Sequence, residues 1–139
     1  MLGILKMKKI EHIGIAVKDI EVSNKVFSKI FGESPYKSER VDSEGVITSF
    51  FKIGESKLEL VASSISESSI SKYLNKNREG MHHIAFSVED IYKEIARLRK
   101  EGIRILNDIP KQGADNQLIC FLNPKDTNGV LIELCQETK

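Results

Sequence analysis

The sequence predicts an α+β fold built from two copies of one strand–helix–strand–strand–strand module. Two internal matches predict it. Segment 10–20 (IEHIGIAVKDI) and segment 81–91 (MHHIAFSVEDI) are identical at five of eleven aligned positions, and KLELV at 57–61 resembles LIELC at 131–135. The matching residues are 71 apart in the first pair and 74 apart in the second, so a small insertion or deletion separates the copies. We expect one domain over 1–139, with modules at 8–62 and 80–136 and a Ser- and Glu-containing linker at 63–79.

The first module begins with a strand that alternation predicts at 9–17. Asp19 is placed to cap a helix over 20–31, and Gly32 is placed to end it. One apolar face of this helix is expected to contain Ile20, Phe27, Ile30 and Phe31. Three further strands are expected at about 36–41, 46–53 and 57–62.

The second module repeats this order. We expect a strand at 81–88, a helix over 91–100 capped by Asp90 and ended near Gly102, and strands at about 103–106, 117–122 and 130–135. The linker has a possible short helix at 70–75. A single module of this size would bury little area, so the two modules are expected to pack as one unit.

Composition excludes several classes of function. With 21 basic and 20 acidic residues, the formal net charge is +1, which favours neither nucleic acid nor a membrane as a partner. The apolar run at the N-terminus is too short for a signal peptide or a membrane span. Two cysteines, Cys120 and Cys135, are too few for a disulfide scaffold, so we expect reduced thiols and a cytoplasmic protein.

Because side chains alternate along a strand, the sequence predicts the face of the sheet on which each histidine and glutamate lies. His12 shares a strand face with the small residues Gly14 and Ala16, and His83 shares one with Ala85 and Ser87. Glu59 and Glu133 point away from the leucines and isoleucines that flank them. A carboxylate inside a buried strand is costly unless it is paired or binds a metal. If a pseudo-twofold axis relates the copies, these four side chains converge.

Two imidazoles and two carboxylates suit one divalent ion such as Zn, Ni, Co, Fe or Mn. The predicted ligands are therefore His12, Glu59, His83 and Glu133. Taken singly, each of these residues is more often structural or solvent-facing. Their recurrence at matched positions in both copies favours the metal site. His82, Cys120 and Cys135 stay outside the predicted ligand set, and Cys135 is interpreted as a small buried hydrophobe.

The pattern resembles the vicinal oxygen chelate superfamily, which includes glyoxalase I, methylmalonyl-CoA epimerase and extradiol dioxygenases. The resemblance covers about residues 8–136, and it is greatest to methylmalonyl-CoA epimerases in HIGIAV at 12–17, GMHHIA at 80–85 and FLNPKDTNGVLIEL at 121–134. It implies two βαβββ modules in a curved mixed sheet, a metal held by the four residues above, and a homodimer.

The resemblance also implies the chemistry. The substrate would be a 2-methylmalonyl thioester, epimerised by proton removal and redelivery through an enolate held by the metal. Glu133 would be one acid–base group. The epimerases carry a second glutamate in a Glu-Gln-Gly turn, but Asp42-Ser43-Glu44-Gly45 places Ser43 there, so Glu44 serves only if the turn shifts by one residue. Asn123 stands where a histidine is common in the family.

Three other functions remain open. A glyoxalase I, acting on the hemithioacetal of a thiol cofactor, needs the same metal site. An extradiol dioxygenase favours two histidines and one carboxylate, so Glu59 as a fourth ligand argues against it, as does the short chain. A non-enzymatic binder of the drug-sequestering kind would need no metal ligands.

Overall fold

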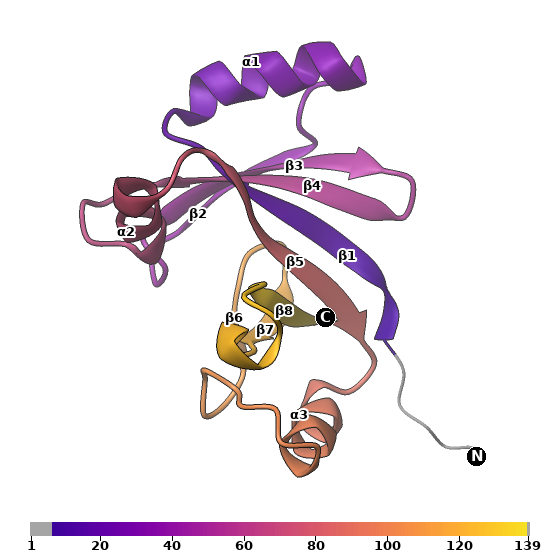
Figure 1. Cartoon of the computed structure of the whole chain (residues 1–139). Helices are drawn as coiled ribbons and strands as arrows, with labels where there is room; N and C mark the ends of the chain where they lie inside the picture. The colour runs from indigo at the N-terminus through magenta and orange to yellow at the C-terminus, as the bar shows by residue number, and fades with distance from the viewer. Residues whose placement is uncertain (1–6, 139) are drawn as a thin grey trace. The chain divides into compact units, whose positions relative to one another are not determined.

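The computed structural model describes residues 7–138, which form two compact units (Figure 1). The first, the 12–82 unit, comprises residues 12–82. The second, the 83–138 unit, comprises residues 83–138 together with residues 7–11. Residues 12–62 of the first predicted module lie in the first unit, and residues 83–136 of the second predicted module lie in the second unit, so each unit is described by itself. Residues 1–6 and 139 lie outside the described part, including the apolar start of the chain.

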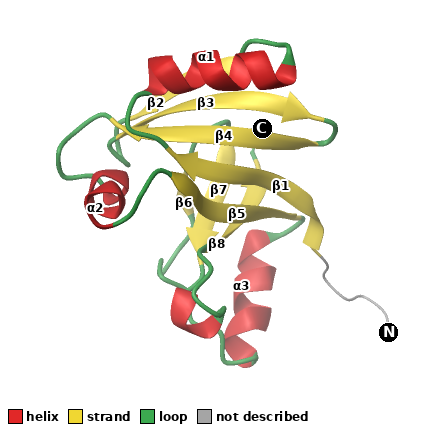
Figure 2. Cartoon of the chain, turned by 45° about the horizontal axis from the view of Figure 1, so that its top comes forward, coloured by secondary structure: helices red, strands yellow, loops and turns green. Residues whose placement is uncertain are grey.

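The 12–82 unit is a four-stranded sheet with two helices. Its elements are β1 (Met7–Ala16), α1 (Ile20–Phe31), β2 (Lys37–Val41), β3 (Val46–Ile53), β4 (Ser56–Ser63) and α2 (Ser69–Lys76). The strand order is β2-β3-β4-β1, with β1 and β4 parallel and the other pairs antiparallel. Helix α1 lies along β3 and β4 (Figure 2). Asp19 begins it by accepting a hydrogen bond from the Val22 amide, and Gly32 ends it with φ 73°.

Each face of this sheet has its own apolar cluster. On one face the apolar residues of β1, β3 and β4 pack with Ile20, Phe27 and Phe31 of α1. The strand residues are Ile13, Ile15, Phe51, Leu58, Leu60 and Ala62, and Val17, which follows β1, joins them. On the other face, Ala16 and Val61 pack with Ile70 of α2. The predicted bulky face of β1 is therefore the helix-covered one, and α2 covers the far end of the small-residue face.

The 83–138 unit repeats this plan. Its elements are β5 (Gly80–Val88, which starts in the other unit), α3 (Ile91–Lys100), β6 (Lys111–Gln112), β7 (Gln117–Phe121), a 3-10 turn at Pro124–Asp126 and β8 (Ile132–Glu137). The strand order is β5-β8-β7-β6, with β5 and β8 parallel. Asp90 caps α3 by accepting from the Lys93 amide. The core beneath α3 contains Ile91, Ile95, Leu98, Val88, Cys120, Leu122 and Leu134.

Most predicted elements are confirmed, including both long helices at their predicted bounds and the short linker helix. The strand predicted at 103–106 is wrong. The amide of Arg104 donates to the carboxylate of Asp126 at 2.8 Å, and only an isolated bridge, Ile105 to Leu122, forms there. The edge of the sheet is instead β6, at Lys111–Gln112.

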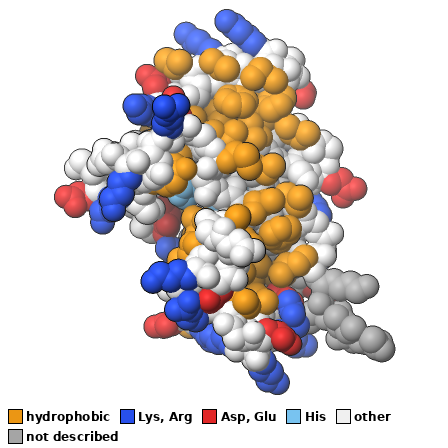
Figure 3. Space-filling view, in the orientation of Figure 1, with side chains coloured by type: hydrophobic (Ala, Val, Ile, Leu, Met, Phe, Trp, Pro, Cys, Tyr) orange, Lys and Arg blue, Asp and Glu red, His pale blue; other side chains and the backbone are white. Residues whose placement is uncertain are grey.

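The prediction for Ile30 is also wrong. Its side chain is 63% exposed, because it shares the outward face of α1 with Val22 and Val26, eight and four residues earlier. Hydrophobic side chains accordingly show on the surface at the top of Figure 3, where Figure 1 draws α1. In the part of the chain that the structure describes, every helix is too short or too polar to cross a membrane.

Candidate metal centre

In the 12–82 unit, His12 and Glu59 form a close buried pair. Nε2 of His12 lies 3.3 Å from Oε1 of Glu59, and the two side chains are only 5% and 9% exposed. The parallel register of β1 and β4 sets this position, because Gly14, two residues after His12, pairs with Glu59. Gly14 presents no side chain beside the carboxylate, so the imidazole can reach it. On the other side of Glu59, β3 places Phe50 opposite it.

The 83–138 unit contains the matching pair with the same spacing. Nε2 of His83 lies 3.3 Å from Oε1 of Glu133, and the two side chains are 5% and 6% exposed. Ala85, two residues after His83, pairs with Glu133 in the parallel register of β5 and β8. Phe121 of β7 pairs with Glu133 from the other side, and its ring meets the His83 imidazole edge to face, with centroids 6.1 Å apart.

The two pairs thus have one local design: a histidine, a small residue, a glutamate and a phenylalanine on one sheet face. Phe50 and Phe121 were missed in reasoning from the sequence alone. The signal was present, because they lie 71 residues apart, the same separation as His12 and His83. The pairs of phenylalanine with glutamate across two strands depend on register, however, and sequence alone does not give it.

The atoms of each pair fit a shared divalent ion. Two ligand atoms that each lie about 2.1 Å from one ion, at an angle of about 90–110°, are about 3.0–3.4 Å apart. The 3.3 Å between imidazole nitrogen and carboxylate oxygen lies within this range in both units. Neutral imidazole and ionised carboxylate are also the donor types that Zn, Co, Ni, Mn and Fe accept. The residues present therefore fit the metal that the family implies.

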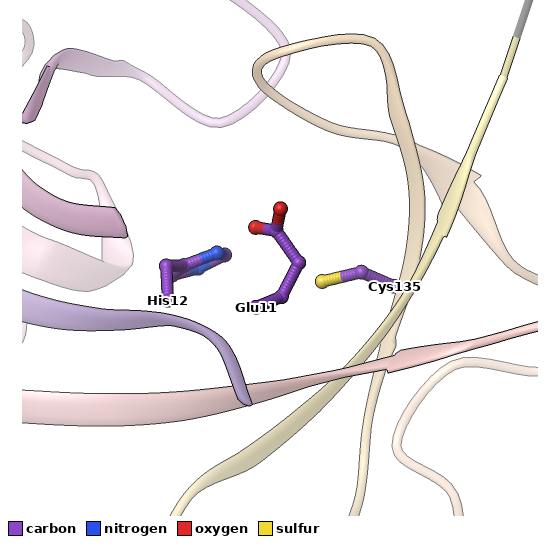
Figure 4. A group of neighbouring side chains, drawn as sticks. All are labelled: Glu11, His12 and Cys135. Atoms are coloured by element: carbon purple, nitrogen blue, oxygen red, sulfur yellow. The ribbon is translucent and has the colours of Figure 1, made fainter. Parts of the chain in front are cut away.

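The second oxygen of Glu133 has a different neighbour. Sγ of Cys135 donates to Oε2 of Glu133 over 3.0 Å, and both residues are buried. A carboxylate oxygen of Glu11, which is 4% exposed, lies within 4.8 Å of the same sulfur (Figure 4). Reasoning from the sequence missed both Glu11 and this contact of Cys135. His12, also drawn in Figure 4, is the next residue along β1 after Glu11.

The remaining histidine and cysteine have structural surroundings. His82 packs its ring edge to face against Tyr73, with centroids 4.8 Å apart. Neither cysteine forms a disulfide, as the sequence predicted, and both are buried. Burial raises the pKa of the Cys120 thiol to about 12, and the negative charge of Glu133 adds to this rise, so the Cys120 thiol is protonated at neutral pH.

The predicted second acid–base group lies in the 12–82 unit, in the turn between β2 and β3. Glu44 is half-buried there, whereas Ser43 is exposed. The Glu44 amide donates to the Val41 carbonyl over 3.0 Å, and the Gly45 carbonyl accepts from the Ser64 amide over 2.8 Å. The turn is therefore held at both ends. Asn123, in the other unit, accepts from the Lys125 amide and so caps the turn that follows it.

Comparison with known proteins places the chain in a family. Residues 11–121 match the model of the Glyoxalase/Bleomycin resistance protein/Dioxygenase superfamily, and the chain belongs to this superfamily. The mitochondrial methylmalonyl-CoA epimerase of Mus musculus is 35% identical over 132 residues, which cover 94% of this chain and 74% of that protein. The ethylmalonyl-CoA/methylmalonyl-CoA epimerase of Cereibacter sphaeroides is 35% identical over 130 residues, covering 92% and 97%.

A solved structure of an epimerase is also similar to this chain. Methylmalonyl-CoA epimerase from Streptomyces coelicolor, as a variant in complex with 2-nitronate-propionyl-CoA, superposes with a TM-score of 0.92 at 35% identity, covering 96% of each chain. The likeness to epimerases of the superfamily confirms the predicted fold of two βαβββ modules. The two relatives and the solved structure named here are methylmalonyl-CoA epimerases, one of which is also named for ethylmalonyl-CoA.

Proposed function

We propose that the protein is a metal-dependent epimerase of a 2-methylmalonyl thioester, with coenzyme A as the thiol. Its similarity to three proteins whose names state this activity supports the substrate class. The observation that carries the metal dependence is the repeated buried pair, histidine Nε2 at 3.3 Å from glutamate Oε1, in each unit. That His12, Glu59, His83 and Glu133 all bind one and the same ion is part of the proposal.

A divalent ion at these residues would supply Lewis-acid stabilisation of the negative charge that develops on the thioester oxygen, worth several kcal/mol. Each ~1.4 kcal/mol by which the barrier falls is a factor of ten in rate. The four side chains would fix the ion in place, and the two phenylalanines beside the glutamates would keep water from the carboxylates. Phe50, for example, is only 1% exposed.

The chain's own acid–base groups would move the proton. One carboxylate removes the proton from C2 of the acyl group on one face, and a second group returns a proton to C2 on the opposite face. The carbon is inverted and no atom is gained or lost. We assign Glu133 to one face and Glu44 to the other. Glu133 would serve both as ligand and as base.

Isotope exchange tests the proposal. The metal-loaded protein is incubated with one epimer of methylmalonyl-CoA in deuterated water, and deuterium at C2 is measured with the ratio of epimers. We expect inversion coupled to incorporation of label, and loss of both after chelation. No exchange at C2, together with turnover of methylglyoxal and a thiol, would instead make the protein a glyoxalase I. Ethylmalonyl-CoA in a parallel assay defines how large an acyl group is accepted.

The predicted homodimer and cytoplasmic location remain predictions. The outward face of α1, with Val22, Val26 and Ile30, is apolar and exposed, so it is one surface that a second copy would cover. Sedimentation velocity at several protein concentrations measures the mass in solution and decides between monomer and dimer.

A further inference from the structure

The two oxygens of Glu133 have different neighbours. Oε1 faces the imidazole of His83 at 3.3 Å, and Oε2 accepts a hydrogen bond from the Cys135 thiol at 3.0 Å. Cys135 lies two residues after Glu133 on β8, so strand alternation places both side chains on the same face of the sheet. The thiol is fully buried, with 0% exposure, among Ala85, Ile119 and Phe121. In such surroundings the sulfur is held in place by packing on β5 and β7.

The first module has no thiol at the matching position. Glu59 and Glu133 are 74 residues apart, and the residue 74 positions before Cys135 is Val61. Val61 is 4% exposed and packs with Ala16, Val46 and Ile70. A valine side chain has no proton to donate, so Glu59 cannot receive the contact that Glu133 receives from this position. The two otherwise matched pairs differ here, and the difference falls on the glutamate proposed to act as a base.

We propose that Cys135 is a positioning residue for Glu133, holding its Oε2 so that Oε1 is directed to His83 and the metal. This inference rests on the proposed function. A free carboxylate can rotate about its last torsion, which is broad and roughly twofold, and exchange its two oxygens. A donor fixed to one oxygen favours one of the two orientations. Groups that hold a metal ligand through a hydrogen bond in this way typically contribute about 10–100-fold to metal affinity or activity.

The carboxylate of Glu11 is the other group near the thiol, within 4.8 Å of the sulfur. A thiol has one proton, so it can donate to one carboxylate at a time. Sγ of Cys135 donates a hydrogen bond to Oε2 of Glu133. Replacement of Glu11 by glutamine should therefore leave the orientation of the Glu133 carboxylate unchanged, because the hydrogen bond from the Cys135 thiol to Glu133 is kept.

The test compares three replacements of Cys135 with a matched control. Cys135→Val copies the residue of the first module and removes the donor with a slightly larger side chain, Cys135→Ala removes it with a cavity, and Cys135→Ser keeps a donor. Cys120→Val is the control, because Cys120 is equally buried but packs beneath α3. Co(II) affinity, the visible spectrum of the Co(II) protein, and kcat and KM for C2 exchange are measured, after unfolding midpoints have shown which variants fold.

We expect Cys135→Val and Cys135→Ala to lower Co(II) affinity about 10–100-fold and kcat by a similar factor, with altered Co(II) bands and little change in KM. Cys135→Ser should restore most of both, and Cys120→Val should match the wild type. Equal affinity and spectra in the wild type, Cys135→Val and Cys135→Ser would overturn the role of Cys135 while leaving the proposed function intact. A wild-type protein that binds no divalent ion and exchanges no C2 proton would overturn the proposed function and, with it, this inference.

An infrared measurement keeps the test independent of how the Cys135 variants fold. The S–H stretching bands of the wild-type protein report the two thiols separately, and Cys120→Val identifies which band belongs to Cys135. Metal loading should shift the Cys135 band more than the Cys120 band, because the acceptor of Cys135 becomes a ligand whereas Cys120 is affected only through the charge of Glu133. Two bands that both ignore the metal would contradict the proposal.

Discussion

Nε2 of His83 lies 3.3 Å from Oε1 of Glu133, and each side chain is about nineteen-twentieths buried. Buried groups that can carry charge are costly unless they are paired or bind an ion. Such a pair has two physical explanations: an imidazolium–carboxylate ion pair, or two ligands of one cation with the imidazole neutral. The same pair at the same spacing in the other module, His12 with Glu59, favours the second explanation, because structural ion pairs need not recur at matched positions.

Loss of either histidine should therefore release the metal. We expect His12→Ala and His83→Ala each to weaken Zn(II) or Co(II) binding by more than about 100-fold, beyond what loss of a second-layer contact typically costs. His82→Ala is the matched control, because His82 neighbours His83 on β5 but packs against Tyr73. Competition with a chromophoric chelator measures the affinities. Equal affinities in all three variants would exclude these histidines as ligands.

Glu44→Gln should separate proton exchange from inversion. If Glu133 and Glu44 act on opposite faces of C2, the variant still removes and returns the proton on the face of Glu133. We expect epimerisation to fall by about 10²–10⁴-fold, the usual contribution of a positioned acid–base group, while one epimer keeps exchanging its C2 proton with solvent.

Ser43→Ala is the control for this turn. Ser43 is exposed, and substitutions at the surface usually change the free energy of unfolding by no more than about 0.5 kcal/mol. The rate of epimerisation by Ser43→Ala should therefore stay within about threefold of the wild-type rate. Deuterium incorporation is measured separately for each epimer, together with the rate of inversion. These two measurements show whether Glu44 acts on one face of C2. A Glu44→Gln protein that inverts C2 at the wild-type rate would require another group on that face.

Much of this site could be predicted because the chain contains its own comparison. A single buried glutamate such as Glu59 predicts little, but its recurrence as Glu133, with His12 recurring as His83, predicts a common role. The two main helices were also predictable, since Asp19 and Asp90 cap them and alternation gives way to helical spacing immediately afterwards.

The features that could not be predicted from the sequence depend on contacts between residues that are far apart in the chain. The thiol of Cys135 was interpreted as a small hydrophobe, because strand alternation gives its face but not the hydrogen bond to Glu133. The strand expected at 103–106 failed for a similar reason. The amide and the guanidinium of Arg104 donate hydrogen bonds to Asp126, 22 residues away, and the local pattern of residues 103–106 does not reveal that partner.

The bond between Arg104 and Asp126 should make stability depend on pH in acid. The Asp126 carboxylate accepts from the Arg104 guanidinium and amide, and these bonds lower its pKa from 3.8 to about 2. Because the folded pKa is the lower one, the stabilisation is present above the unfolded value and is lost as pH falls towards about 2. The unfolding free energies of wild type and Asp126→Asn should differ at pH 6 and converge towards pH 2, as chemical denaturation would measure.

Asp42→Asn is the control for that titration. Asp42 has a 3.5 Å contact with Arg40 in which both side chains are mostly exposed, and such surface pairs contribute little. Its difference from the wild type should be small at every pH. A difference for Asp126→Asn that is constant across the range would show that the substitution acts through packing of the 124–129 loop instead of through the charge.

Gly113 and Ile119 should be energetically coupled. A Cβ added at Gly113 would lie 2.8 Å from Cδ1 of Ile119 and 3.1 Å from its Cγ1 and Cγ2, and Ile119 is 7% exposed, so it has little room to move. Gly113→Ala alone should therefore destabilise the protein by about 1–3 kcal/mol, the usual effect of overpacking. Ile119→Val alone should cost about 0.5–1.5 kcal/mol by removing a buried methyl group. In the double variant the added methyl group occupies the space that the removed methyl group vacates. The loss of unfolding free energy in the double variant should therefore be smaller than the sum of the losses in the two single variants. Urea denaturation of the four proteins in a double-mutant cycle measures the coupling, and strictly additive losses would mean that Ile119 yields to the new Cβ without strain.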